Sequence, residues 1–165
     1  MKGKHISWLA MFIALSVVGA MIKIPAVITS VAFDSFPALL ASALLGSPYG
    51  AVVAGAGHLL SALFGGMPLG PLHALIAVEM AILAWIFALF YQRGKKYIAS
   101  ILFLLGNTFV APLPFIFLLG TAFYVGMIPS LLLGSLVNTI VALILIPRLQ
   151  TIFTGAFGKK AEAKS

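Results

Sequence analysis

The sequence predicts an all-α integral membrane protein, a compact bundle of six transmembrane helices with a short second helix and both termini in the cytoplasm. Composition, apolar segments and the placement of basic residues support this prediction. Of the 165 residues, 62% are hydrophobic and only 8% are charged, and the mean hydropathy is +1.19. Soluble domains have about 25% charged residues, so this chain has too little polar surface for water. The composition excludes soluble enzymes, nucleic-acid-binding modules and disordered proteins.

Six apolar segments follow one another, each interrupted by residues that disfavour helix. Pro25 ends the first segment, and Pro37 opens the short second one, because proline fits the first turn of a helix but not its interior. Turn residues at 47–50 precede the third segment, and a glycine-rich loop at 65–70 precedes the fourth. We expect helices at residues 6–24, 36–45, 51–64, 71–91, 97–110 and 127–146.

The last two helices have less regular borders. Basic residues at 93–96 separate the fourth helix from the fifth, and a proline-containing apolar connection runs from residue 111 to 126. Pro147 and Arg148 close the sixth helix. We therefore divide the chain into a six-helix substrate-binding membrane domain, residues 1–150, and a cytoplasmic tail, residues 151–165.

Basic residues predict which side of the membrane each connection occupies. The net charge is +7, and Lys and Arg collect in cytoplasmic loops of membrane proteins. With six spans, nine of the ten basic residues fall on the side of the two termini, and only Lys23 falls on the other. We therefore place the termini in the cytoplasm. The nine are Lys2, Lys4, Arg93, Lys95, Lys96, Arg148, Lys159, Lys160 and Lys164.

The outer connections are apolar, which is unusual for loops in water. They cover residues 24–35, 65–70 and 111–126, and the first and third are long. Irregular backbone at membrane depth persists only where protein or a cavity satisfies its hydrogen bonds. We expect these connections to fold back over the outer half of the bundle and to cap a pocket open to the outside.

Small residues at four-residue spacing predict close helix contacts. One such stripe, from residue 126 to 142, runs through the sixth helix, and Ala10 and Ala14 form another near the cytoplasmic end of the first. Small residues let helices approach closely in lipid. Packing inside the bundle explains most such stripes. The Ala10–Ala14 pair is the best candidate for docking a different protein.

Polar side chains gather in the outer half of the predicted bundle. A charged group inside the membrane costs at least about 2.5–3.5 kcal/mol, so its presence needs a reason. Glu79 is the charged residue clearly inside a span. Together with aromatic side chains, including Phe115, these groups suggest a small-molecule pocket. The candidate ligand contacts are Phe33, Asp34, Ser35, Phe36, His58, His73, Glu79, Tyr124 and Asn138.

Each polar group also has a purely structural interpretation. A buried His or Asn, such as Asn107 or Asn138, can form an interhelical hydrogen bond instead of a ligand contact. Glu79 can be protonated or paired with His58 or Lys23. Asp34 can cap the second helix, and the aromatic residues can form an interfacial belt.

Chemical motifs for catalysis are absent from the sequence. There is no Walker A, G-x-S-x-G or H-E-x-x-H pattern, and no cysteine. The histidines lack the spacing of a metal site, and we expect no cofactor and no enzymatic activity. A self-sufficient proton-coupled transporter using Glu79 remains an alternative, although it has a single intramembrane carboxylate and no clear inverted repeat.

Nearly the whole chain resembles the substrate-binding S components of energy-coupling-factor (ECF) vitamin transporters. The resemblance rests on the six spans, the apolar first outer connection, and Ala10 and Ala14, which match the family's alanine motif. Four stretches resemble the branch for α-ribazole, a cobalamin precursor: VGAMIKIP at 18–25, VAFDSFP at 31–37, GHLLSA at 57–62 and GPLH at 70–73.

The resemblance implies an outward-facing binding protein in a bacterial cell membrane, without its own nucleotide site. Its partners would be a transmembrane coupling subunit, docked at Ala10 and Ala14, and two cytoplasmic ATPases; no nucleic acid is involved. The first outer connection would act as a gate. The family's pocket position points to Asp34, Ser35, His73, Glu79, Tyr124 and Asn138, with His58 a further candidate. Riboflavin, pantothenate or a pyridoxine-like compound are alternative ligands to α-ribazole.

Overall fold

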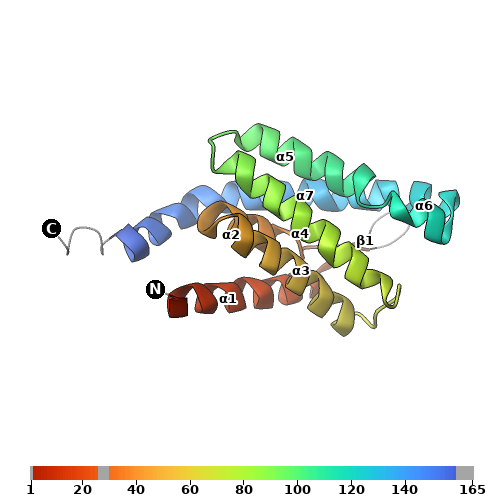
Figure 1. Ribbon diagram of the computed structural model, residues 1–165, viewed down its shortest axis with the longest axis horizontal. Coiled ribbons are helices and arrows are strands. Elements are labelled where there is room, and N and C mark those ends of the chain that lie inside the picture. Colours follow the sequence, from red (N-terminus) through yellow and green to blue (C-terminus); the bar gives the residue numbers. More distant parts are fainter. Residues whose placement is uncertain (1, 26–29, 159–165) are drawn as a thin grey trace.

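Helices running along one axis form most of the protein in the computed structural model, which describes residues 2–25 and 30–158 (Figure 1). Two short strands and one π-helical turn interrupt the helices. The helices are α1 (Lys2–Met21), α2 (Phe36–Leu45), α3 (Ser47–Phe64), α4 (Leu72–Tyr91), α5 (Lys96–Leu105), α6 (Pro114–Leu119) and α7 (Thr121–Gly158). The strands are β1 (Lys23–Pro25) and β2 (Ser30–Ala32), and the π-helical turn is η1 (Gly106–Val110).

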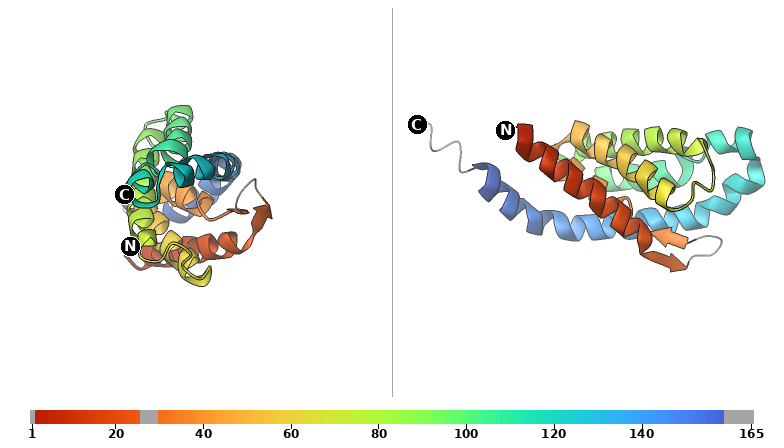
Figure 2. Two further views of the ribbon diagram at one scale, coloured as in Figure 1. Left: turned by 90° about the vertical axis from the view of Figure 1, so that its right-hand side faces the viewer. Right: turned by 90° about the horizontal axis from the view of Figure 1, so that it is seen from below.

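The connections divide between the two ends of the bundle. The start of α1, the α2–α3 and α4–α5 turns, and the last turns of α7 lie at one end; the strands, the 65–70 loop and α6 lie at the other (Figures 1 and 2). This is the alternation that the basic residues predicted for the described part of the chain. The side of the membrane that each end faces stays a prediction. Lys159, Lys160 and Lys164 of the predicted tail lie outside the described residues.

Helix length alone identifies fewer spans than the sequence predicted. In the described ranges, three helical segments are long and apolar enough to cross a membrane: Leu72–Tyr91, Lys96–Leu119 and Thr121–Phe153. The second of these joins α5, η1 and α6. Segments His5–Met21 and Phe36–Leu45 are apolar but shorter. The number of six spans therefore stays a prediction.

The first outer connection contains two short paired strands, in a chain that is otherwise helical as predicted. Strands β1 and β2 pair antiparallel, with Lys23 opposite Ala32 and Pro25 opposite Ser30. The β-branched residues Ile24 and Val31 face each other in this register. Strand pairing satisfies backbone N–H and C=O groups that an irregular apolar loop would leave without partners.

The predicted ends of the last helix are also corrected. Helix α7 begins at Thr121 and continues through Pro129 and Pro147 to Gly158, although Pro147 was expected to close it. Proline removes one backbone hydrogen bond and bends a helix, but membrane helices tolerate this, and α7 is curved in Figure 2. The 111–126 connection is largely helical and contains α6. This helix begins at Pro114 and ends before Gly120, whose φ of 89° is outside the helical range.

Helix α2 lies at the centre of the core. Residues Ala38 to Ala41 are at most 2% exposed, so all faces of α2 are covered, by α1, α3, α4 and α7. The large buried side chains around it include Phe12, Phe87, Phe103 and Ile146. The Ser42 hydroxyl donates to the Ala84 carbonyl (3.0 Å) and ties α2 to α4.

Candidate functional site

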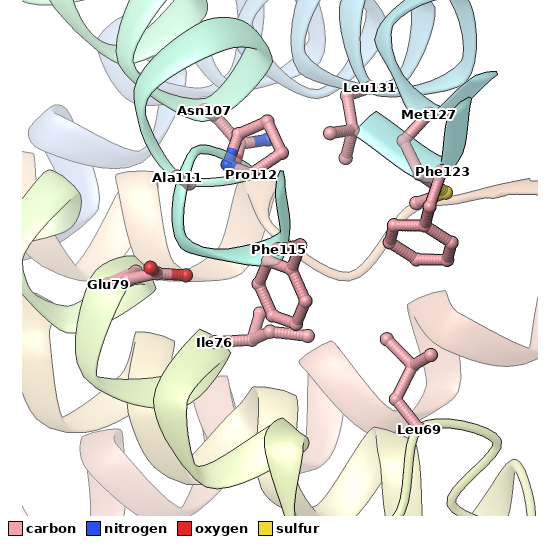
Figure 3. A pocket seen from close by; sticks show the side chains of 10 residues that line it. All are labelled: Leu69, Ile76, Glu79, Asn107, Ala111, Pro112, Phe115, Phe123, Met127 and Leu131. Carbon is pink, nitrogen blue, oxygen red and sulfur yellow. The ribbon is translucent and has the colours of Figure 1, made fainter. Parts of the chain in front are cut away.

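A cavity lies between α4, the segment from η1 to α6, and the first turns of α7 (Figure 3). Its walls are almost entirely apolar and contain two phenylalanines. Pro112 and Pro114 lie beside it, at the junction between η1 and α6, where proline removes backbone hydrogen bonds. The lining residues are Leu69, Ile76, Glu79, Asn107, Ala111, Pro112, Phe115, Phe123, Met127 and Leu131.

Glu79 is the one ionisable residue among those that line the cavity. Its carboxylate extends from α4 toward the loop that carries Ala111 and Pro112 (Figure 3). The Oε2 atom is buried and has no hydrogen-bond partner among the described residues. A buried polar atom normally has a partner, so this carboxylate oxygen is available to a group that enters the cavity.

Asn107 supplies the second polar group of the cavity. Its amide nitrogen donates to the Ser135 hydroxyl of α7 (2.7 Å), and Ser135 is 1% exposed. This bond fixes the orientation of the side-chain amide and leaves its carbonyl oxygen as an acceptor. The π-helical turn of η1 places Asn107 here by adding one residue to the helical turn.

A second, larger cavity shares the lining residues Glu79 and Ala111 with the first. It lies between α4 and the segment from Val110 to Phe117, and Phe117 is 90% exposed. Its volume is about 550 Å³, against about 60 Å³ for the first. Ligand pockets usually measure about 300–1,000 Å³. The first cavity is therefore smaller than an ordinary ligand pocket, whereas the volume of the second lies within that range.

Asn138 is not among the residues that line the cavity, and its side chain forms hydrogen bonds with backbone groups of this chain. Its Oδ1 accepts the backbone N–H groups of Ser35 (3.1 Å) and Phe36 (2.8 Å). Its Nδ2 donates to the carbonyls of Ala32 (2.8 Å) and Gly134 (2.9 Å). The side chain is 2% exposed. These four bonds use the full capacity of the amide, so Asn138 caps α2 from α7 and holds the end of β2.

His58 and His73 contact each other across α3 and α4. His73 was expected near the surface, but it is buried. The Leu69 N–H donates to His73 Nε2 (3.3 Å), and His73 Nδ1 lies 3.1 Å from His58 Nε2. A neutral His73 therefore carries its proton on Nδ1 and donates it to His58. This pair ties the 65–70 loop to α3, and Glu79 is not its partner.

The remaining candidates flank these groups. Ser35 donates its hydroxyl to Asp34 Oδ1 (3.0 Å). Burial raises the pKa of Asp34, and the hydrogen bond from Ser35 opposes this rise. The Phe33 N–H donates to the Gly19 carbonyl (3.1 Å), and the Tyr124 hydroxyl donates to the Phe109 carbonyl (3.2 Å).

The predicted ligand contacts are thus distributed over several places. Glu79 alone among them lines the cavity, whereas the segment from Phe33 to Phe36 gathers around Asn138. Sequence reasoning named Asn107 and Phe115 without assigning them to the site, and it missed Phe123, Met127 and Leu131. These three residues share one face of α7 at four-residue spacing. The expected helix began only at residue 127, so this shared face was not recognised from the sequence. The ligand-binding roles stay predictions.

Ala10 and Ala14 lie on the exposed face of α1. Other small-residue positions are used inside the bundle: Gly57 packs against Ser16, and Ala142 is fully buried. The two alanines therefore differ from the internal stripes, since the described residues of this chain leave their face open.

Comparisons with known proteins agree with this architecture. The family model for the substrate-specific component of ECF transporters matches residues 4–163. A similar solved structure, described as "Structure and mechanism of the S component of a bacterial ECF transporter", has a TM-score of 0.72 and 22% sequence identity, and the match covers 92% of this chain and 98% of that chain. At this identity the likeness shows the fold alone. A search of curated proteins found no match.

Proposed function

Because the chain belongs to the substrate-specific components of ECF transporters, we propose that the Glu79 cavity binds a small vitamin or vitamin precursor from outside for ATP-driven import. The observation that carries this proposal is an apolar, aromatic cavity with one unpartnered carboxylate oxygen. Such a cavity suits a ligand with a flat apolar part and a few hydrogen-bonding groups. ATP hydrolysis would reside in separate subunits.

We propose α-ribazole as the first ligand to test. Its benzimidazole is flat and apolar, and Phe115 and Phe123 offer aromatic surface for it. Its ribose hydroxyls suit the acceptors of Glu79 and Asn107. Riboflavin and pyridoxine-like compounds share these features and are the next candidates.

Purified protein in detergent should be stabilised by α-ribazole. At a concentration about 100 times the dissociation constant, binding adds about 2.7 kcal/mol to the free energy of unfolding, which raises the Tm of a chain of this size by roughly 5–10 °C. Benzimidazole and ribose, each added alone, are the controls. If another vitamin raises the Tm and α-ribazole does not, the ligand assignment is wrong.

We also propose that Ala10 and Ala14 dock on the transmembrane coupling subunit. Replacing either with leucine should reduce co-purification with a co-expressed ECF coupling subunit and its two ATPases, because the larger side chain holds the helices apart. Ligand-induced stabilisation should remain. Ala74→Leu is a matched control, since Ala74 is an exposed alanine on α4. Unchanged co-purification of the α1 variants would contradict this docking site.

A self-sufficient proton-coupled transporter remains the second candidate, because Glu79 Oε2 is buried and has no hydrogen-bond partner in the part of the chain that the structure describes. It requires uptake into proteoliposomes that contain this protein alone, driven by a proton gradient without ATP and abolished by Glu79→Gln. Uptake that depends on the coupling subunit and ATP excludes it.

A further inference from the structure

We propose that Glu79 selects ligands by charge, so that the cavity admits neutral or cationic molecules that donate hydrogen bonds and rejects carboxylates and phosphates. This inference rests on the proposed function and narrows its ligand class. It follows from the polar groups of the two cavities that Glu79 lines.

The two cavities have few polar lining residues and no cationic one among the described residues. Of the residues that line the two cavities, Glu79 and Asn107 are polar, and the others are aliphatic, aromatic, proline or methionine. No described Lys, Arg or His side chain lines either cavity. The arginine and lysines of the 93–96 turn lie at the opposite end of α4 (Figure 1). A bound anion would therefore have no cationic partner here.

The two polar side chains offer mainly acceptors to a ligand. Glu79 Oε2 has no donor among the described residues, and one of the two amide N–H groups of Asn107 donates to Ser135. Glu79 and the side-chain carbonyl of Asn107 therefore accept hydrogen bonds, and one neutral N–H of Asn107 is left to donate. An ammonium, amine, amide N–H or hydroxyl matches these acceptors, whereas a carboxylate or phosphate would find one neutral donor and no cation.

The ionised form of Glu79 supplies most of the selectivity. When Glu79 is ionised, a ligand anion meets a like charge in an apolar cavity, which is strongly unfavourable. A neutral side chain at this position, such as protonated Glu79 or glutamine, removes that repulsion and leaves only the lost hydration of the anion against it. Neutral and cationic ligands are therefore preferred most strongly by ionised Glu79, and pantothenate is the least favourable of the vitamins considered above.

Binding of matched pairs tests the inference, because each pair shares a scaffold and differs in charge. The pairs are α-ribazole and its 5′-phosphate, riboflavin and riboflavin 5′-phosphate, and pantothenol and pantothenate, measured by calorimetry on the purified full-length protein. For every scaffold that binds, the neutral member should bind at least about tenfold more tightly than the anion.

Variants assign the selectivity to Glu79. Glu79→Gln keeps the size of the side chain but removes its charge and adds a donor, so the preference for the neutral member should fall by about tenfold. Val78→Leu, beside Glu79 on α4 but 58% exposed and outside the lining of both cavities, should leave the preference unchanged. Equal binding of the two members, or an unchanged preference in Glu79→Gln, overturns charge selection but leaves the proposed function intact. Absence of binding by every pair overturns both.

Discussion

Replacing Asn138 with alanine should lower the free energy of unfolding by about 3 kcal/mol, because four backbone groups lose their partner at once. The N–H groups of Ser35 and Phe36 lose their acceptor, and the carbonyls of Ala32 and Gly134 lose a donor. Water does not replace these bonds readily, since the side chain is 2% exposed. Thermal unfolding of the variant in detergent measures the effect as a lower Tm.

A neighbouring residue provides the matched control for this variant. Thr139 is 5% exposed, and its hydroxyl has no hydrogen-bond partner in the described parts of the chain. Thr139→Val keeps the shape and should change stability by less than about 0.5 kcal/mol. Asn138→Asp keeps an acceptor for the two N–H groups but places its second carboxylate oxygen against the carbonyls of Ala32 and Gly134, so it should be at least as destabilising as Asn138→Ala. Equal stability of Asn138→Ala and Thr139→Val would contradict the capping role.

Gly19→Ala should displace the first outer connection from α1. A Cβ at Gly19 would overlap the carbonyl oxygen of Phe33, and the Gly19 carbonyl accepts the Phe33 N–H (3.1 Å). Because the obstacle is backbone, a side-chain rotation cannot relieve the overlap. Overpacking of this kind costs about 1–3 kcal/mol or more. Faster hydrogen exchange of the Phe33 amide and a lower Tm should report the displacement.

The control for this variant lies on the same helix. A Cβ at Gly3 would have no other atom within 4 Å, so Gly3→Ala should leave both the Tm and the exchange of the Phe33 amide unchanged. If Gly19→Ala behaves like Gly3→Ala, then α1 and the hairpin end are not in the close contact that the structure shows.

The sequence predicted a mainly helical membrane protein but not where its helices end. Proline was expected to stop the last helix at Pro147, yet α7 continues to Gly158. The energy of an interrupted backbone hydrogen bond depends on what surrounds the proline, and a sequence does not show the surroundings. For the same reason the strands at Lys23–Pro25 and Ser30–Ala32 were missed, since pairing partners depend on how the connection folds.

The candidate site was predicted in part. Glu79 stands out in a sequence because an isolated acid among some twenty apolar residues is costly, and it does line a cavity. Asn138 stands out for the same reason, but the structure uses it to cap α2. Residue type shows that a buried polar group needs partners; it does not show whether the partner is backbone or a ligand.

Membrane embedding and the alternation of inner and outer connections follow from composition and from the placement of Lys and Arg, because hydrophobic free energy and the charge bias of loops are summed over residues whatever their partners. The partners themselves depend on which segments come together. Folding gives Asn138 four backbone partners and His58 a histidine, and it leaves Glu79 Oε2 with none among the described residues. That difference comes from packing between distant segments, which a sequence does not show.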